Sequence, residues 1–350
     1  MECAMLKGKV ILITGGTGSF GHAFTGTLLK DHEPKKIIIL SRDEFKQYEM
    51  AKIFSDRKYP IRYFLGDIRD KDRLFRAFEG VDYVVHAAAL KQVPALEYNP
   101  TEAVKTNVVG ADNIVDAAID AGVQKVIALS TDKAVNPINL YGATKLVAEK
   151  IFIAANAYAG GRVKFAVVRY GNVVGSRGSV IPLFLKLKKQ KAREIPITDK
   201  RMTRFWITLE QGVDLVLKAL ETSEGGEVFV PKIPSMKIVD VAKAIHPNGT
   251  FRMVGIRPGE KIHEVLISED EVRATKILNG IYVILPQFFD QRVQEKYKHC
   301  PSVPENFVYR SDTNDRWVTA ENLEAMINPK AKKAVSPKMA EADTDKARSQ

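Results

Sequence analysis

The chain has 350 residues, of which 45% are hydrophobic and 27% charged, so it can bury a large core in one large or two modest domains. Its net charge of +11 is dispersed apart from residues 186–191 and 330–333, and neither run is interleaved with aromatic residues, which favours an anionic small molecule such as a nucleotide over nucleic acid. No stretch of about 18 apolar residues predicts a membrane span, and two widely spaced cysteines, Cys3 and Cys300, indicate free thiols in a reducing cytoplasm.

Apolar runs typical of buried parallel strands alternate with helical patterns through the first half of the chain. Strands are expected at residues 9–14, 36–40, 61–65, 83–86, 126–129 and 164–169. Helices are expected between them, at residues 19–31, 43–56, 71–79, 101–121 and 140–158. This alternation predicts an α/β fold with a Rossmann-like, doubly wound parallel sheet and right-handed crossovers.

After about residue 175 the rhythm breaks into shorter elements. Helices are expected at residues 180–190, 209–222 and 237–245, and a brief strand at residues 227–230. They are too irregular to extend the sheet alone, so we expect a smaller cap over the carboxyl ends of the strands, with the substrate in the cleft. The predicted organisation is a nucleotide-binding domain at 1–175, which can recruit later segments, a mainly substrate-binding domain at 176–327 and a disordered tail at 328–350.

A glycine-rich segment follows the first predicted strand and opens the first predicted helix. It reads Gly15-Gly16-Thr17-Gly18-Ser19-Phe20-Gly21. In this context Gly15 allows the tight turn, Gly18 lets the backbone approach a pyrophosphate, and Gly21 permits close packing of helix on strand. The segment therefore predicts a dinucleotide site, with a merely structural glycine turn as the alternative.

The tips of the next strands offer further cofactor contacts. Ser41, Arg42 and Lys46 supply donors and charge that suit the 2′-phosphate of NADP, although the neighbouring Asp43 could instead hold the ribose of NAD. Asp67, followed by Ile68, could bind the adenine amino group or simply cap a helix.

Small residues after the fourth predicted strand, Ala87 and Ala88, let backbone run against the ribose and nicotinamide. Lys91 follows them and is either a site residue or a solvated lysine. Asn107, in the next predicted helix, either supports the backbone near the site or is an ordinary residue of a helix face.

Residues 126–149 carry an acid–base apparatus at the end of the fifth predicted strand. Tyr141 and Lys145 are one helical turn apart, so they point the same way, and a nearby ammonium group favours phenolate over phenol. Ser130 or Thr131 could hydrogen-bond the same substrate hydroxyl, and Thr131 completes the triad. Asp132 and Lys133 add a spare acid and a spare base that a simple alcohol dehydrogenase does not need. The alternative for this pair is a solvated ion pair on a loop.

The glycines, the triad Thr131, Tyr141 and Lys145, and the segment Tyr170-Gly171-Asn172-Val173 resemble the extended short-chain dehydrogenase/reductases over roughly residues 7–325. Four further motifs resemble the UDP-N-acetylglucosamine 4,6-dehydratases of that family. They are the segments at 86–94, 130–134, 177–182 and 202–205, which read HAAALKQVP, STDKA, RGSVIP and MTRF.

The resemblance also discriminates within the family. Dehydratases for dTDP-glucose or GDP-mannose carry Asp-Glu where this chain has Asp132-Lys133, and epimerases lack the pair. Membrane-anchored UDP-N-acetylglucosamine dehydratases keep the pair but typically carry methionine at the position of Tyr141. A chain with both Lys133 and Tyr141 is most similar to the C5-inverting dehydratases that open pseudaminic acid biosynthesis for flagellin glycosylation.

The resemblance implies NADP as cofactor, a UDP-sugar as substrate and a homo-oligomer that uses the helices at 101–121 and 140–158. In the implied reaction Tyr141 takes the 4-hydroxyl proton, Lys133, neutral if buried, removes the C5 proton, and Asp132 protonates the departing 6-hydroxyl. No cluster has metal-ligand spacing, so no metal is expected. The substrate candidates are Lys91, Tyr170, Asn172, Arg177, Ser179, Val180, Thr198, Met202, Arg204, Arg257 and Glu260.

Among the substrate candidates the arginines suit a diphosphate best, although pairing with acidic neighbours such as Asp199 and Glu260 is the alternative for each. The rival functions are a C5-retaining dehydratase or a 4-epimerase of a UDP-sugar, a non-catalytic dinucleotide sensor, and, more distantly, a nucleic-acid binder.

Overall fold

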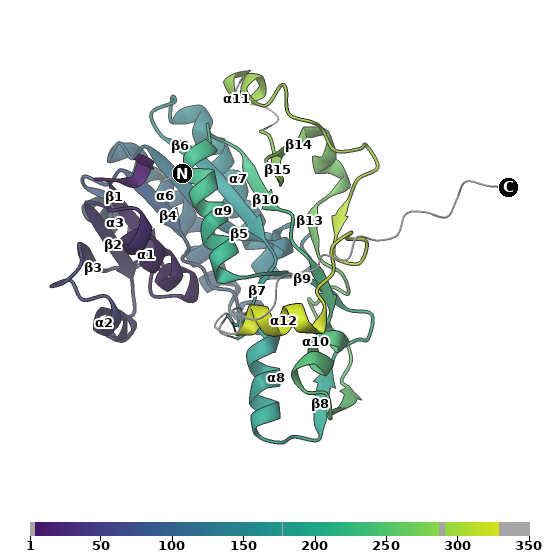
Figure 1. The fold of residues 1–350 in the computed structure, drawn as a ribbon. Coiled ribbons are helices and arrows are strands. Elements are labelled where there is room, and N and C mark those ends of the chain that lie inside the picture. The colour runs from purple at the N-terminus through teal and green to yellow at the C-terminus, as the bar shows by residue number, and fades with distance from the viewer. Residues whose placement is uncertain (1–3, 177, 287–290, 329–350) are drawn as a thin grey trace.

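The computed structural model describes residues 4–176, 178–286 and 291–328 (Figure 1). Its centre is a nine-stranded sheet in the order β14-β15-β10-β6-β5-β4-β1-β2-β3. The seven strands from β3 to β10 run parallel, and β15 and β14 continue the sheet antiparallel. The strands are β1 (Val10–Thr14), β2 (Lys36–Ser41), β3 (Ile61–Leu65), β4 (Tyr83–His86), β5 (Lys125–Thr131), β6 (Lys164–Tyr170), β10 (Val228–Pro231), β14 (Thr275–Leu278) and β15 (Ile281–Ile284).

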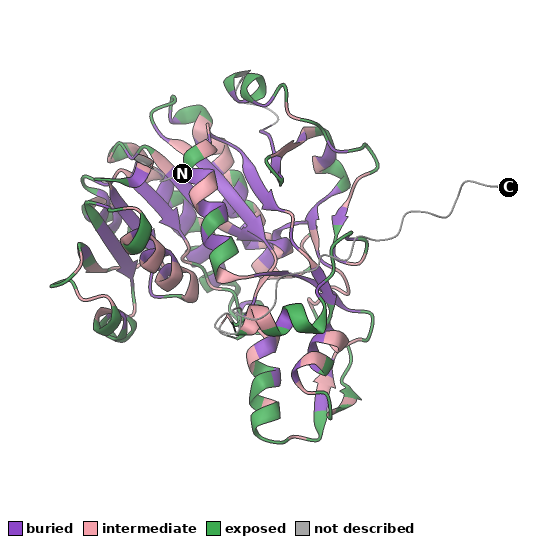
Figure 2. Cartoon of the chain, in the orientation of Figure 1, coloured by how far each residue is buried: buried purple, intermediate pink, exposed green. Residues whose placement is uncertain are grey.

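Helices cover both faces of this sheet, which explains why its central strands are continuous apolar runs (Figure 2). On one face α1 (Ser19–Asp31) packs against α9 (Leu209–Thr222). On the other face three neighbouring helices form a row: α3 (Lys71–Phe78), α6 (Gly110–Asp120) and α7 (Leu140–Tyr158). Figure 1 shows α9 in front of the strands and α7 behind them. The predicted doubly wound α/β fold is therefore confirmed.

The remaining elements of this half are short. They are the single-turn helices η1 (Ala4–Leu6) and η3 (Asp132–Ala134), and the helices α2 (Glu44–Ile53), α4 (Val93–Tyr98) and α5 (Pro100–Val104). A π-helical turn, η2 (Lys105–Val109), joins α5 to α6. The helix predicted at 101–121 is present but not regular: it begins at Pro100, and a wider π-helical turn interrupts its α-helical hydrogen bonding at residues 105–109. Such π turns occur frequently at functional sites.

A second lobe projects from the sheet and has a hydrophobic core of its own (Figure 1). It contains α8 (Val180–Lys189), β8 (Glu194–Ile197), α10 (Ile238–Ile245), β12 (Thr250–Met253) and α12 (Ala320–Ile327). Small sheets connect it to the central layer: β11 (Ser235–Lys237), β9 (Thr203–Ile207) and β7 (Asn172–Val173) form one, and β13 (Val265–Ile267) pairs with β16 (Tyr309–Arg310). The other helices are η4 (Glu269–Ala274) and α11 (Gln291–Lys296).

Among the short elements after residue 175, the strand expected at residues 227–230 joins the central sheet as β10. This strand pairs in parallel with β6, and β15 then pairs with β10, so three late strands belong to the central layer. The lobe built around α8 and α10 agrees with the expectation of a smaller cap. The predicted tail beyond Asn328 lies outside the described residues. Within the described ranges, no helix has the length and apolarity to cross a membrane.

Candidate functional site

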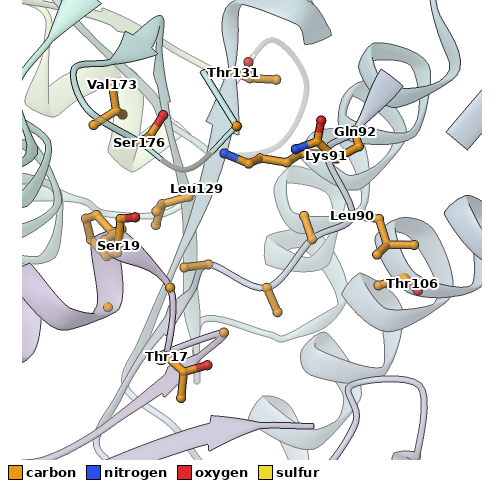
Figure 3. Close-up of a pocket in the computed structure, with 18 of the residues that line it drawn as sticks. Thr17, Ser19, Leu90, Lys91, Gln92, Thr106, Leu129, Thr131, Val173 and Ser176 are labelled. Atoms are coloured by element: carbon orange, nitrogen blue, oxygen red, sulfur yellow. The ribbon is translucent and has the colours of Figure 1, made fainter. Parts of the chain in front are cut away.

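A cavity of about 680 Å³ opens at the carboxyl ends of the parallel strands, where ligands bind in open α/β sheets. It extends from the glycine loop after β1 to the start of α8. Figure 3 shows Thr17 and Ser19 of the glycine loop on one side of it, and Lys91 and Gln92 on the other. The cavity therefore joins the predicted cofactor segment to the predicted acid–base segment.

The glycine loop has no room for a side chain at Gly15 or at Gly21. Gly15 has a φ of +64°, and a Cβ there would lie 2.8 Å from the backbone of Ala88. A Cβ at Gly21 would lie 2.1 Å from the carbonyl oxygen of Gly16. Helix α1 begins directly after Gly18, which provides no side-chain cap, so the first backbone N–H groups of the helix face the cavity. This cradle fits the pyrophosphate of a dinucleotide.

The tip of β2 carries the positive charge of the cofactor end. The Thr17 and Ser41 hydroxyls are 3.0 Å apart, and the half-exposed Arg42 guanidinium lies 3.6 Å from the Asp67 carboxylate. The Asp43 carboxylate accepts a hydrogen bond from the Lys46 backbone and pairs with the Lys46 ammonium at 2.8 Å. Asp43 therefore caps α2, and Arg42, Asp43 and Lys46 all line the cavity.

Asp67 and Ile68 both line the cavity, as do Ser19 and Phe20. The Arg69 side chain holds the Asp67 carboxylate at 2.8 Å. Burial raises the pKa of Asp67, but the hydrogen bonds and charge of Arg69 outweigh this and lower it overall. Asp67 is thus a carboxylate in the cavity wall that also accepts the Arg69 N–H as a turn residue, and its contact with adenine stays a prediction.

Asn107 lies behind the cavity wall, in the π turn. Its side-chain oxygen accepts a hydrogen bond from the Leu90 N–H at 2.8 Å, and its amide group donates to the Leu90 carbonyl at 2.9 Å and to the Thr144 hydroxyl at 3.0 Å. The amide thus fixes the backbone between Ala88 and Lys91, which lines the cavity. Burial, and then the charge of Lys133, lower the pKa of Lys91.

Helix α7 presents Tyr141 and Lys145 to the cavity. Its N-cap Asn139 accepts a hydrogen bond from the Gly142 N–H at 2.8 Å, and a Cβ at Gly142 would lie 2.1 Å from the Lys133 carbonyl oxygen. The helix can therefore begin directly against η3. The Lys145 ammonium donates to the Leu129 carbonyl at 2.7 Å, and burial lowers its pKa to about 8.

The pKa of Tyr141 is raised, whereas the sequence predicted that a neighbouring Lys145 would lower it. Burial raises the pKa of its phenol, and the ammonium group that opposes this is that of Lys133, helped by a hydrogen bond with Thr131. Of the two candidates at the end of β5, Ser130 donates its hydroxyl hydrogen to the buried Glu149, whereas the Thr131 hydroxyl donates to Asp132 Oδ1 at 3.0 Å and lines the cavity with Tyr141. Thr131 is thus the hydroxyl on the reacting side.

Asp132 and Lys133 form a partly buried pair with a third member, Glu264. The Lys133 ammonium lies 2.9 Å from Asp132 Oδ1 and 3.5 Å from Glu264 Oε1. The expectation that burial makes Lys133 neutral was wrong in this state: burial lowers the pKa of Lys133, but the two carboxylates outweigh it and raise it overall. Burial raises the pKa of Asp132, and Asp132 Oδ2 has no hydrogen-bond partner among the described residues.

The substrate candidates fall into two groups. Those that line the cavity are Lys91, Tyr170, Asn172 and Ser179. Val180 follows Ser179 as the first residue of α8, and Arg177 lies outside the described residues. The other candidates, all away from the cavity wall, are Thr198, Met202, Arg204, Arg257 and Glu260.

The two favoured arginines are engaged elsewhere. Arg204 is buried and donates to the carbonyl oxygens of Thr203, Ile262 and Lys261 at 2.7, 3.1 and 2.9 Å. Arg257 is exposed and lies 3.7 Å from Glu260, the acidic neighbour that the alternative named. Neither presents its guanidinium to the cavity in this structure.

Sequence reasoning missed several cavity residues and one charged neighbour. Gln92, Leu129, Ser176 and Leu209 line the cavity, and their place just after strands or at a helix start was the available signal. Glu264 had no local signal, because its role depends on Lys133, far away in the chain. No group of three or more His, Cys, Asp or Glu in the described part of the chain could hold a metal ion.

The doubly wound sheet, the glycine cradle and the Tyr141–Lys145 helix define a protein of the short-chain dehydrogenase/reductase class. The model of the family described as polysaccharide biosynthesis protein matches residues 11–286, and the chain belongs to this family.

Relatives of known name cover nearly the whole chain. A UDP-N-acetylglucosamine 4,6-dehydratase (inverting) of Campylobacter jejuni is 53% identical over 331 residues, which are 93% of this chain and 98% of the relative. A UDP-glucose 4-epimerase of Rickettsia akari is 46% identical over 288 residues, covering 80% of this chain and 84% of the relative.

Among solved structures, Pen from Bacillus thuringiensis matches with a TM-score of 0.85 and 38% identity, over 93% of this chain and 99% of that one. A dTDP-glucose 4,6-dehydratase from Streptomyces venezuelae with NAD bound matches with a TM-score of 0.65 over 72% of this chain and 86% of that one. At 23% identity, this second match shows the shared fold alone.

Proposed function

We propose that this protein is a UDP-N-acetylglucosamine 4,6-dehydratase that inverts C5 and makes UDP-2-acetamido-2,6-dideoxy-β-L-arabino-hex-4-ulose. The observation that carries the proposal is that Lys133, in contact with Asp132 at 2.9 Å, lines the same cavity as Tyr141 and Lys145. Oxidation of an alcohol needs only Tyr141 and Lys145. Loss of water from the neighbouring carbons needs an additional acid and base, which Asp132 and Lys133 supply.

NADP is the proposed cofactor, held by the glycine loop, by Arg42 and Ser41 at the 2′-phosphate, and by Asp67 at the adenine. A bound NADP would supply the acceptor for the hydride from C4 of the sugar and the donor of that hydride to C6. The supporting observations are the cradle at Gly15 and Gly21, which a Cβ would fill, and the two cations Arg42 and Lys46 in the cavity wall after β2, where the neighbouring Asp43 is paired with Lys46.

Tyr141 is the proposed acceptor of the 4-hydroxyl proton. Burial and the Asp132 charge raise the pKa of the phenol overall, and the Lys133 charge and a hydrogen bond with Thr131 oppose them and favour its ionised form. Lys145, bound to the Leu129 carbonyl, is fixed one turn further along α7. These groups orient the hydroxyl and remove its proton while C4 becomes a ketone.

Asp132 and Lys133 are the proposed elimination pair. Transfer of one proton from the Lys133 ammonium to Asp132 Oδ1, across 2.9 Å, gives a neutral amine and a neutral acid with no change in the total number of protons. The amine then removes the C5 proton, which the 4-ketone acidifies, and the Asp132 carboxyl gives its proton to the 6-hydroxyl, which leaves as water. A proton later returns to C5 from the opposite face and inverts it.

The sugar nucleotide is proposed to lie against Lys91, Asn172 and Ser179, in the part of the cavity that adjoins α8. We further propose that the protein works as a cytoplasmic homo-oligomer at the start of pseudaminic acid biosynthesis. Exposed apolar side chains on the α6–α7 side, Val109, Val147 and Tyr158, support an interface between copies there.

The second candidate function is a UDP-glucose 4-epimerase, which the relative at 46% identity favours. An epimerase would use Tyr141 and Lys145 in the same way, but it would return the hydride to C4. It would leave Asp132 and Lys133 with no proton to move, and it predicts a product with an unchanged C5–H bond.

Proton NMR of the purified protein with UDP-N-acetylglucosamine in D2O, without added nicotinamide, tests the proposal. A 4-keto-6-deoxy product with deuterium at C5 and the couplings of the L-arabino configuration is expected. A D-xylo product would keep the dehydratase and remove the inversion. Formation of UDP-N-acetylgalactosamine would establish the epimerase instead.

A further inference from the structure

Glu264 is a buried carboxylate beside the proposed elimination pair, and the mechanism above gives it no step. Its side chain is 2% exposed, and it lies just before β13. The Glu264 N–H donates to the Ser311 hydroxyl at 2.9 Å, and the Ser311 N–H donates to the Glu264 carbonyl at 2.9 Å. The backbone that carries this carboxylate is therefore clamped from both sides.

Three cations surround the Glu264 carboxylate. Oε1 lies 3.5 Å from the Lys133 ammonium and 3.7 Å from Arg204 Nε, and Oε2 lies 3.9 Å from the Lys261 ammonium. A buried charge is tolerated when it is paired, and here the pairing is threefold. Burial alone would raise the pKa of Glu264, but Lys133, Arg204 and Lys261 lower it overall, so Glu264 is ionised.

Arg204 and Lys261 are themselves fixed. The Arg204 guanidinium donates to the carbonyl oxygens of Thr203, Ile262 and Lys261, which ties β9 to the segment that carries Glu264. The Lys261 ammonium donates to the Val135 carbonyl at 2.6 Å, directly after η3. The connecting segments around β9 and β13 thus contact the proposed elimination pair and the residues directly after it.

We propose that Glu264 is a positioning residue for the elimination step, one that holds the Lys133 ammonium beside Asp132 and sets the charge of that pair from the lobe side. This rests on the proposed dehydratase function. It also assigns Arg204, which the sequence predicted as a phosphate ligand, to the support of Glu264.

Several charged or titratable groups surround Asp132 and Lys133. Lys133 faces Asp132, Glu264, Arg204, Lys91 and Tyr141. With Glu264 ionised, the Lys133 ammonium is stabilised by a second carboxylate. Burial raises the pKa of Asp132, and the Glu264 charge raises it further against the effect of Lys133. The negative charge of Glu264 therefore favours protons on both members of the pair, and its contact with the Lys133 ammonium keeps that nitrogen in place.

The pH profile of dehydration tests this, with UDP-N-acetylglucosamine deuterated at C5 used to show that cleavage of the C5–H bond limits the rate. Neutral Lys133 is needed to remove the C5 hydrogen of the substrate, so this rate rises as pH increases through the pKa of Lys133. Glu264→Gln removes one of the two carboxylates that raise this pKa. We expect the rising limb to move to lower pH by about one unit or more, as loss of an opposite charge at this distance implies.

Two variants complete the test. Glu264→Asp keeps the charge but withdraws it by one methylene, so a smaller displacement in the same direction is expected, and this variant serves if Glu264→Gln does not fold. Glu269→Gln removes an exposed carboxylate from the same segment and should reproduce the profile of the unaltered protein. If both Glu264 variants lower the maximal rate but leave the pH of the rate increase unchanged, Glu264 is only a structural residue. This result would overturn the inference. If the unaltered protein does not make the 4-keto product, the proposed function itself fails.

Discussion

Arg169 and Glu149 form an ion pair in the interior of the protein, directly behind the proposed active site. Arg169 Nη2 donates to Glu149 Oε2 at 2.6 Å and Nε to Oε1 at 3.2 Å, and the two side chains are 2% and 3% exposed. Glu149 also accepts the hydroxyl hydrogen of Ser130, and Arg169 holds Glu271 at 2.9 Å. The pair thus ties the end of β5, helix α7 and η4 into one buried network.

Replacing Arg169 by methionine should destabilise the protein by about 3–5 kcal/mol, because it leaves Glu149 buried without its cation. Urea unfolding at neutral pH measures this. Arg252→Met is the matched control, since Arg252 and Glu194 form an Arg–Glu pair at 3.5 Å whose side chains are both more than half exposed. The control should cost less than about 1 kcal/mol. Equal losses in the two variants would show that burial of the pair is unimportant.

Local patterns in the sequence predicted most of the sheet, because each strand and its crossover are set by periodicity within a few residues. The glycine cradle was equally accessible, since Gly15 and Gly21 act on neighbours close in the chain. The charge of Lys133 was not, because Glu264 meets it only through the packing of the lobe on η3.

The arginines of the second half show the same limit. Arg204 carries a charge that suits a phosphate, but its partners are backbone carbonyls of residues 261 and 262, more than fifty positions later. No spacing in the sequence predicts such a contact. The place of β10 beside β6 was likewise decided by long-range pairing and not by the short apolar run itself.

Gly21→Ala should destabilise the protein by about 3 kcal/mol and abolish cofactor binding, because the new Cβ would lie 2.1 Å from the Gly16 carbonyl oxygen, which is backbone and cannot move alone. Gly212→Ala is the matched control in another helix: no heavy atom lies within 4 Å of the new Cβ, and it should stabilise α9 by about 0.5 kcal/mol. Denaturant unfolding of both variants measures the difference. Similar stabilities would remove the close approach of α1 to the loop as a cause of the glycine pattern.

Arg42→Ala should weaken NADP about tenfold or more while changing NAD affinity little, since the guanidinium would contact the 2′-phosphate that NAD lacks. Titration calorimetry with each dinucleotide gives the two affinities. Arg62→Ala, an exposed arginine on β3 away from the cavity, should leave both unchanged. An equal loss for NADP and NAD in Arg42→Ala would remove the argument for the 2′-phosphate.

Lys133→Met should abolish incorporation of deuterium at C5 and slow dehydration by about 10²–10⁴-fold, because the base of the elimination is gone. NADP binding should persist, since the glycine loop and Arg42 are untouched. NMR in D2O follows exchange and product together. Lys150→Met, an exposed lysine on α7, should behave as the unaltered protein. Persistent exchange and turnover in Lys133→Met would mean that another group removes the C5 proton.

Lys145 should give stability a distinctive dependence on pH. Burial lowers its pKa from an ordinary value near 10.5 to about 8, although the Glu149 charge opposes part of the effect. Below pH 8 both the folded and the unfolded chain hold the proton, and the folded state bears the cost of a buried charge. Between pH 8 and 10.5 the unfolded chain keeps a proton that the folded protein has released, so the free energy of unfolding rises with pH through this group.

Lys145→Met lacks this titration, so the free energy of unfolding of the unaltered protein minus that of the variant should rise by about 3 kcal/mol between pH 7 and pH 10.5. Denaturant unfolding of both proteins across that range measures the difference, in which the other titrating groups cancel. Lys150→Met again provides the control, because it removes an exposed lysine from the same helix. A flat or falling difference for Lys145→Met would mean that Lys145 is not buried as a charge beside Tyr141, and it would withdraw the ammonium group from the proposed oxidation step.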